Sequence, residues 1–328
     1  QLIMSDDKLR IALQPTRRYR GLAAFSGKLK APRPQAADED VIVVKSDRGG
    51  FLMLFTDRQQ IIYQPVTGEQ TLITFNQDTG GLHHDAVRLA EDKSALAARA
   101  LNQPENHRAS ADIDAEGNYV IDLLAGFSTA SAQVVIDPEA FAFAQVESIN
   151  QALKNSRIDG VKIRLVGTET IDKDYAIHNS NLSLMTKAFT KGIAQYSPDL
   201  VAAFFIGDKA VDNAIAWGYV NGYITINNIA STTALRHEVG HNAGGSHCSD
   251  ADASGYAYGW DNGKSQTIMC GNTSGYYSNP ELKDRFGLPL GHVTKANMAR
   301  VWREAKVRSA AYRPANFPVI EEKWLVMD

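Results

Sequence analysis

The chain has 328 residues, of which 44% are hydrophobic and 22% are charged, and its formal net charge is −3 at pH 7. This near balance of charge argues against a dedicated surface for nucleic acid or anionic membranes, and no apolar run approaches the about 20 residues that a membrane helix needs. The length allows one large domain or two moderate ones with a sizeable core. We therefore expect a globular protein without a nucleic-acid partner or a membrane span.

The first part of the chain predicts a β-rich region followed by a connector. Residues 41–75 contain apolar and β-branched runs separated by the turn sequences DRGG, TDRQQ and TGEQ, which is typical of β-hairpins. Residues 91–101 favour a short helix, and residues 102–118 have the turn formers of a linker. We therefore expect a first domain at 1–112, which takes in most of this linker, and a second at 113–328.

Strands and helices alternate in the second region. Strands are predicted at 119–127, 161–170 and 199–207, and helices at 137–156 and 179–195. Such alternation requires crossover connections and a largely parallel sheet. The fold class we expect is therefore α+β, with an α/β-like second domain.

The chain then predicts a strand with a turn, a helix and, near its end, a closing helix. The strand is expected at 217–228, with its turn at Asn221–Gly222, and the closing helix at 294–312. Between them, residues 231–245 read STTALRHEVGHNAGG, which suits a helix that begins near Ser231 and stops at Gly244.

Three histidines at the end of this helix have the spacing of metal ligands. His237 and His241 are four residues apart, so both project from one helical face. Once the chain turns back, His247 can approach the same ion. Glu238 can reach a water on the metal without being a ligand. Three neutral nitrogens and one water make an open tetrahedral zinc site, which is the catalytic kind.

The alternative interpretation is a histidine-rich helix end without a metal. An HExxH pattern alone arises by chance often enough to be only suggestive. Here a glycine also occupies the eighth place and a histidine the eleventh, and chance agreement with the longer pattern is on the order of one in ten thousand or rarer. The pattern therefore favours the metal site.

The stretch HEVGHNAGGSH at 237–247 resembles the elongated zinc-binding signature of the metzincin metalloendopeptidases. TIMCG at 267–271 resembles the Met-turn of that family, with Met269 in the expected role. YYSNP at 276–280 resembles the following segment of reprolysin-like and related bacterial secreted members. The likeness covers about residues 117–314, and it implies a metzincin catalytic domain with a twisted, mostly parallel sheet and a long zinc-binding helix.

The resemblance implies a secreted zinc-dependent endopeptidase with one catalytic Zn²⁺ ion. Glu238 would act as the general base that takes a proton from the attacking water, and a protein or peptide substrate would lie extended along the strand at 217–228. Two alternatives remain. One is a non-catalytic zinc-containing binding protein or toxin component on the same fold, and the other is a zinc enzyme that acts on a non-peptide substrate.

The two cysteines, Cys248 and Cys270, suit either one disulfide in an oxidising compartment or two buried thiols. The resemblance implies the disulfide, because one cysteine follows the last zinc ligand and the other follows Met269. The rival interpretation makes Cys248 a fourth zinc ligand. The chain begins at Gln1 without a signal-like segment, which favours a secreted protein whose signal has been removed over a sequence trimmed at its start.

The chain departs from some metzincins at Gly271, where those proteins have a tyrosine that contacts zinc. Tyr276 and Tyr277 are candidates to hold the oxyanion or the substrate, with a structural role as the alternative. Calcium stays undecided, because Asp250, Asp252 and Asp261 lie near one another in sequence but form no recognised loop.

The resemblance also implies that residues 1–112 are a pro-domain and that the chain is a latent zymogen. The alternative is a permanent binding domain, and a cut near 110–118 during maturation would separate the two. The region contains no cysteine, so a histidine or aspartate would have to block the zinc. The candidates for this latency ligand are His83, His84, His107, Asp112 and Asp114.

Overall fold

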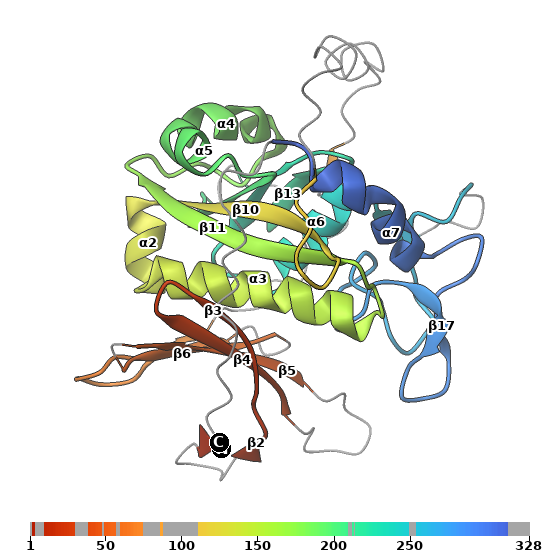
Figure 1. Ribbon diagram of the computed structural model, residues 1–328, viewed down its shortest axis with the longest axis horizontal. Helices are drawn as coiled ribbons and strands as arrows, with labels where there is room; N and C mark the ends of the chain where they lie inside the picture. Colours follow the sequence, from red (N-terminus) through yellow and green to blue (C-terminus); the bar gives the residue numbers. More distant parts are fainter. Residues whose placement is uncertain are drawn as a thin grey trace.

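The computed structural model describes residues 2–3, 10–29, 39–47, 49–56, 60–74, 86–87, 111–208, 212, 214–248 and 254–313. Two six-stranded sheets account for most of its strands. The long helix α3 (Pro138–Asn155) lies between the N-terminal sheet and the sheet that contains β10 and β11, so this part of the molecule is built in three layers (Figure 1).

The N-terminal sheet is an antiparallel meander in the order β3-β4-β5-β6-β7-β8. Its strands are β3 (Gln14–Tyr19), β4 (Leu22–Leu29), β5 (Glu39–Ser46), β6 (Phe51–Phe55), β7 (Gln60–Gln64) and β8 (Thr71–Thr74), and the short pair β1 (Leu2–Ile3) and β2 (Arg10–Ile11) lies outside it. The hairpins predicted at 41–75 are therefore confirmed. The sequence analysis missed β3 and β4, which are joined by a two-residue turn at Arg20 and Gly21.

The second sheet has the order β11-β10-β12-β14-β13-β9. Its pairs are parallel except β13 with β14, as the alternation of strands and helices predicts. The strands are β9 (Ala86–Val87), β10 (Tyr119–Ser128), β11 (Val161–Ile171), β12 (Leu200–Phe205), β13 (Ala216–Tyr219) and β14 (Ile224–Asn228). Residues 86–87 thus belong to this sheet, although they precede the predicted domain boundary.

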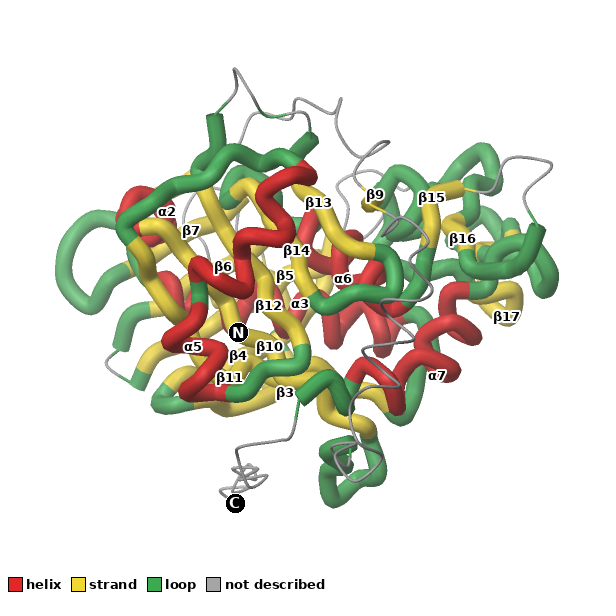
Figure 2. The backbone as a smooth tube through the Cα atoms, turned by 90° about the horizontal axis from the view of Figure 1, so that it is seen from above, coloured by secondary structure: helices red, strands yellow, loops and turns green. Residues whose placement is uncertain are grey.

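Helices cover both faces of the second sheet. The face that carries Leu123 and Phe127 packs against α3, α6 (Ala234–Ala243) and α7 (Met298–Ser309). On the other face, Leu124 packs with Phe189. Figures 1 and 2 show α4 and α5 over that second face. The remaining elements are α2 (Thr129–Val135), η2 (Asn179–Leu184), α4 (Met185–Ala188), α5 (Thr190–Tyr196), β15 (Ser246–Cys248), β16 (Tyr258–Gly259), β17 (Asn279–Lys283) and β18 (Pro289–Leu290).

Two predictions for the second region need correction. The single helix predicted at 179–195 is a 3₁₀ turn followed by two short helices, because the backbone of Phe189 leaves the helical region at ψ 40°. That break turns the ring of Phe189 into the core, where it lies 6.2 Å from the ring of Phe205. Residues 111–118, predicted as linker, form a turn attached to β10, with the Val120 N–H donating to the Asp112 carbonyl at 2.8 Å.

Helix α3 is buried on opposite sides because each sheet covers one of them. Phe141 packs on the second sheet, with its ring 5.3 Å from that of Phe204. Two residues on, the ring of Phe143 lies 5.6 Å from that of Tyr19 in the N-terminal sheet. One continuous hydrophobic cluster contains residues from both sheets and from α3. A helix with apolar side chains on two opposite sides belongs to a core rather than to a surface.

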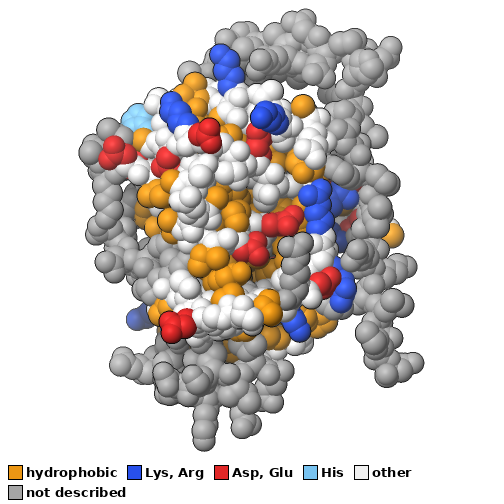
Figure 3. Space-filling view, turned by 90° about the vertical axis from the view of Figure 1, so that its left-hand side faces the viewer, with side chains coloured by type: hydrophobic (Ala, Val, Ile, Leu, Met, Phe, Trp, Pro, Cys, Tyr) orange, Lys and Arg blue, Asp and Glu red, His pale blue; other side chains and the backbone are white. Residues whose placement is uncertain are grey.

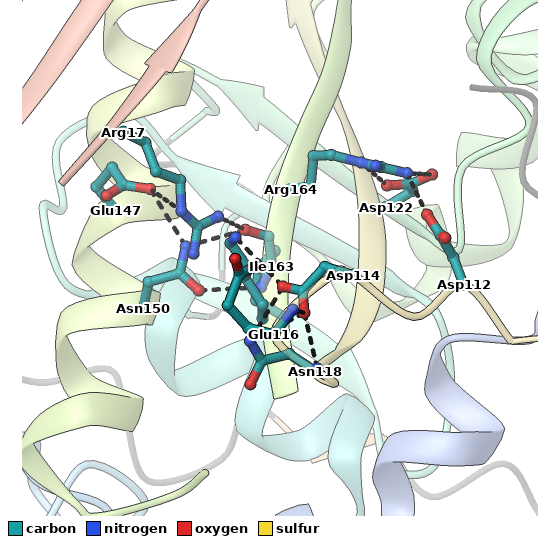
Figure 4. Close-up of polar contacts among 11 residues, drawn as sticks. Arg17, Asp112, Asp114, Glu116, Asn118, Asp122, Glu147, Asn150, Ile163 and Arg164 are labelled. Carbon is teal, nitrogen blue, oxygen red and sulfur yellow. Dashed lines mark hydrogen bonds and ion pairs between the residues drawn. The ribbon is translucent and has the colours of Figure 1, made fainter. Parts of the chain in front are cut away.

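Polar contacts also attach the N-terminal sheet to the rest of the chain (Figure 4). Arg17 donates to the Ile163 carbonyl at 2.6 Å and approaches the Glu147 carboxylate at 3.6 Å. Asn155 at the end of α3 donates to Asp40 at 2.9 Å. The buried Glu147 and Asp40 therefore both have partners across this boundary.

The described residues include no helix that is long and apolar enough to cross a membrane. On the face of the molecule in Figure 3, basic and acidic side chains are interspersed among apolar and neutral ones.

The shared core makes a prediction about unfolding. Phe143→Ala should lower the free energy of unfolding by about 3–5 kcal/mol, because it leaves a cavity between α3 and the N-terminal sheet. Urea unfolding followed by circular dichroism should show one transition, shifted as a whole. Val66→Ala, at a side chain that is 63% exposed, is the control and should change stability by no more than about 0.5 kcal/mol. Two separate transitions, with only the first affected, would contradict the shared core.

Candidate metal centre

Helix α6 carries the first two histidines and has defined ends. It begins at Ala234, whose N–H donates to the Ser231 hydroxyl at 3.0 Å, three residues after the predicted start. It ends at Gly244, where φ is +117° and the N–H donates to the His241 carbonyl at 2.8 Å. The stop predicted at this glycine is confirmed, because only a residue without a β-carbon adopts such a φ cheaply. The chain then reverses and places His247 on β15.

The three imidazole rings converge on one point. The Nε2 atoms of His237 and His241 are 3.1 Å apart, and the Nε2 atom of His247 lies 3.2 Å from each of them. His237 and His241 are fully buried and His247 is half-buried. Among the described residues, this trio is the one group of histidine, cysteine or acidic side chains that could hold a metal ion.

Hydrogen bonds at the other ring nitrogens fix the orientation of two of the rings. Nδ1 of His237 lies 2.6 Å from the Ile268 carbonyl, and Nδ1 of His241 lies 2.8 Å from the Gly245 carbonyl. A carbonyl oxygen can only accept, so each Nδ1 carries the proton. In a neutral ring the lone pair is then on Nε2, which is the atom that faces the other histidines. Such second contacts are typical of metal-binding histidines.

The spacing of the three Nε2 atoms fits a metal ion. Metal–nitrogen bonds of about 2.0–2.1 Å in a tetrahedral arrangement require nitrogens about 3.3 Å apart. The observed separations of 3.1–3.2 Å are close to that value. Lone pairs that face one another at this distance would repel, whereas a cation between them would be attracted to all three. The donor set is therefore suited to a metal ion.

The turn at 267–271 supports the first histidine from below. Ile268, which accepts from His237, is itself held because its N–H donates to the Tyr276 carbonyl at 2.8 Å. Met269 is fully buried against α6, and a β-carbon on Gly240 would clash with the Met269 sulfur. Gly240 lies between the first two histidines, so the absence of a side chain there lets Met269 approach the helix.

A disulfide joins Cys248 to Cys270, with their Cα atoms 4.7 Å apart, so this pairing is confirmed. The bond connects the residue after His247 to the residue after Met269. Because the Cys248 sulfur is used in the disulfide, the interpretation of this cysteine as a fourth metal ligand is wrong.

Glu238 directly follows His237 in helix α6 and lies under strand β13. Its side chain is fully buried. A β-carbon added to Gly218 of β13 would lie 2.8 Å from Glu238 Oε2 and 3.0 Å from the Glu238 backbone oxygen. The strand therefore passes directly over this carboxyl group, and it can do so because residue 218 has no side chain.

The structure separates the two candidate tyrosines from one another. Tyr277 is fully buried, and its hydroxyl donates to the Arg236 carbonyl of α6. Burial also raises the pKa of this hydroxyl well above its usual value. Its position is that of a structural residue beneath the helix. Tyr276 is half-buried and contributes its backbone carbonyl to Ile268.

Asp112 and Asp114 take part in contacts on β11 rather than in the histidine cluster (Figure 4). Asp112 pairs with Arg164 at 2.7 Å. Asp114 accepts hydrogen bonds from Asn118 and from Lys162. Burial raises the pKa of its carboxyl group, but these two partners lower that pKa by more, so it lies below its usual value. These contacts argue against a role for either aspartate as latency ligand.

Several other candidates lie wholly or partly outside the described residues. The latency candidates His83, His84 and His107 fall there, as do Asp250 and Asp252 from the suggested calcium site. Asp261 is described, and its carboxylate accepts hydrogen bonds from the Gly263 N–H and the Gln266 amide.

The sequence analysis missed Asn242, which directly follows the second histidine. It is buried in the last turn of α6, and its amide donates to the carbonyls of Tyr219 at 2.9 Å and Ile224 at 3.3 Å. Asparagine is a poor helix former, because its side chain competes for backbone groups. Its presence inside a helix beside a metal ligand was the signal that could have identified it.

The fold and the site together define a mixed α/β protein with a buried trihistidine cluster that could hold a metal ion. No protein-family model matches the sequence. No curated protein is significantly similar to it in sequence.

Among the solved structures that align with this chain, two are described here. A chain from a structure of a chaperone–substrate complex aligns with a TM-score of 0.54 and 24% identity, over 62% of this chain and 41% of that chain. The present chain thus spans about two fifths of that protein, and the likeness shows a similar fold. A chain of metalloproteinase-II from Bacteroides fragilis aligns over 90% of this chain and 87% of that one, with a TM-score of 0.43 and 11% identity.

The disulfide makes a prediction about stability. Replacing both Cys248 and Cys270 by serine should lower the free energy of unfolding by roughly 3 kcal/mol, because the bond closes a loop of about 22 residues in the unfolded chain. Chemical denaturation of the oxidised wild type and of the double variant measures the difference. Reduced wild type is the matched control and should behave as the double variant does; equal stability of all three would refute the expected contribution.

Proposed function

We propose that the protein is a secreted zinc-dependent endopeptidase. The observation that carries the proposal is the convergence of three imidazole Nε2 atoms at 3.1–3.2 Å, and the residue that follows the first of these histidines is the buried Glu238. Three histidine ligands leave one position of a tetrahedral ion for water, as in catalytic rather than structural sites. The resemblance of residues 237–247 to the metzincin signature supports the same assignment.

Zinc is the metal that we assign to the site. Neutral imidazoles suit it, and the separation of the three Nε2 atoms is close to what a tetrahedral zinc ion requires. When bound, zinc would lower the pKa of a water molecule and polarise the carbonyl of the bond to be cut. His237, His241 and His247 would hold it.

Glu238 would move the proton in the reaction. Its carboxylate is the general base that accepts a proton from the attacking water, and it then gives that proton to the leaving amine. Glu238 directly follows the metal-binding His237 in α6, and its carboxyl group lies under β13. It is therefore placed between the first proposed zinc ligand and the strand along which we propose that the substrate binds. Its burial would keep bulk water away from this transfer.

The substrate that we propose is an extended peptide. An extended peptide can add itself to an exposed sheet edge through backbone hydrogen bonds. One side of β13 pairs with β14, and the other side, where Gly218 and Tyr219 pair with β9, is where we propose that a peptide adds. A peptide in the place of β9 would pair with Gly218, whose β-carbon position faces Glu238 Oε2.

We further propose that the chain is a latent zymogen. The N-terminal region supplies β9, which pairs with β13 in parallel, Ala86 opposite Gly218 and Val87 opposite Tyr219. The edge to which a peptide would add is therefore already taken at these positions. This contact supports inhibition by competition for β13, without requiring a side chain from the N-terminal region on the metal.

Glu238→Gln provides the first test of the function. The variant should retain one zinc per chain, measured by plasma mass spectrometry, because Glu238 is not a ligand. Its hydrolysis of a quenched fluorescent peptide library should fall at least 100-fold, because the general base is lost. A chelator should abolish the wild-type activity, and zinc should restore it.

Glu281→Gln is the matched control, because it makes the same chemical change at an exposed position on β17. It should retain wild-type activity. A wild type that binds zinc but cleaves no peptide, before or after proteolytic activation, would favour the non-catalytic binding protein instead. Undiminished cleavage by Glu238→Gln would refute the role of this residue.

Proline substitutions in β9 test the latency. Proline at residue 86 or 87 removes a backbone N–H and fixes φ, so one of these substitutions should break the pairing with β13. We expect that variant of the full-length chain to cleave peptide faster than the wild type without prior proteolysis. Val87→Ala keeps the backbone N–H and is the control. If neither proline variant is activated, occupation of the β13 edge does not cause latency.

A further inference from the structure

We infer that Asn242 is a positioning residue that holds β13 over Glu238. The inference deepens the proposed function, because it names what fixes the substrate strand relative to the catalytic helix. It starts from the observation that the helix with the metal ligands and the hairpin β13–β14 are joined by a small set of buried hydrogen bonds.

The amide of Asn242 holds both ends of the hairpin turn. Its Nδ2 atom donates to the Tyr219 carbonyl at the end of β13 and to the Ile224 carbonyl at the start of β14, at 2.9 and 3.3 Å. The residue is 2% exposed, so no solvent competes for these carbonyls from its side. Its Oδ1 atom accepts no hydrogen bond from any residue that the structure describes. The side chain of Asn242 therefore contributes through the two hydrogen bonds that its Nδ2 group donates.

The backbone of the turn adds a bond in the opposite direction. The Asn221 N–H donates to the His241 carbonyl at 2.9 Å, so one turn residue is fixed to a residue that also supplies a metal-facing nitrogen. The Tyr312 hydroxyl, which follows α7, donates to the Asn221 carbonyl at 3.1 Å. The turn is thus held against the end of α6 from two sides.

These bonds decide the height of β13 above the carboxyl group of Glu238. Gly218 precedes Tyr219, whose carbonyl Asn242 holds, and a β-carbon at residue 218 would lie 2.8 Å from Glu238 Oε2. The clearance between strand and carboxyl group is therefore smaller than one side-chain atom. A shift of the hairpin would disturb the backbone hydrogen bonds by which a peptide adds to β13, and it would therefore weaken peptide binding.

Asn242→Asp tests the inference with little change of size. It replaces the amide donors by an oxygen that faces two carbonyl oxygens, so the bonds to the hairpin are lost. Hydrogen–deuterium exchange of the full-length chain should then become about tenfold faster or more in residues 217–226 than in the wild type. In the activated enzyme, KM for a peptide should rise about tenfold, with a smaller change in kcat and with one zinc per chain retained.

Asn279→Asp is the matched control. Asn279 is equally buried, and its Nδ2 atom donates to the Ser156 carbonyl at 2.9 Å, away from the hairpin. The same chemical change there should leave KM and exchange in residues 217–226 as in the wild type. Asn242→Ala, which adds no oxygen, is measured as well, so that poor folding of the aspartate variant does not decide the outcome.

The results separate this inference from the proposed function. Unchanged exchange in residues 217–226 in either Asn242 variant, or an equal increase in Asn279→Asp, overturns the positioning role. If the Asn242 variants exchange faster at the hairpin but the wild type cleaves no peptide, Asn242 holds the hairpin and the proposed peptidase function is wrong. Faster exchange with an unchanged KM shows that the hairpin does not bind substrate.

Discussion

The arrangement of the site depends on two hydrogen bonds from histidine Nδ1 atoms to backbone carbonyls. They force the lone pairs of His237 and His241 toward a common point, and they come from two different segments that follow the helix. Ile268 lies in the turn at 267–271, and Gly245 lies in the reversal after α6. Each segment must therefore fold before its ring is oriented, which couples the metal site to the packing around it.

The disulfide and the buried methionine hold those two segments together. Cys248 directly follows His247, and Cys270 directly follows Met269, so one covalent bond connects the strand of the third histidine to the turn that supports the first. Met269 in turn packs on α6 at Gly240. The disulfide and the Met269 contact thus hold the segments whose carbonyls orient His237 and the strand that carries His247.

The sequence predicted those parts of the molecule in which one local signal is decisive. The spacing of the histidines placed His237 and His241 on one face of a helix and His247 in the segment after the chain reversal, and Gly244 marked the end of α6. The helix expected at 137–156 is observed as α3, which begins at Pro138 after the capping residue Asp137. The bend at Phe189 could not be predicted from residues 179–195 alone, because the pocket that accepts its ring is formed by other strands. Asn242 was missed because its partners, Tyr219 and Ile224, belong to another element of the fold.

The position of the N-terminal sheet was also beyond the sequence analysis. A hairpin pattern predicts strands but not the helix on which they pack, and the arginines of β3 resemble a solvated edge until Arg17 is seen to reach the Ile163 carbonyl. The sequence analysis expected a helix at 137–156 without the two sheets that cover it. In the structure, Phe141 and Phe143 point to different sheets.

This double burial of α3 bears on what a maturation cut would leave behind. Scission of the backbone near 110–118 would separate β9 and the N-terminal sheet from the histidine-bearing part, yet Phe143 would still be covered by that sheet. The two fragments would therefore remain associated after cleavage. Their separation would expose apolar side chains of α3 to water and favour aggregation.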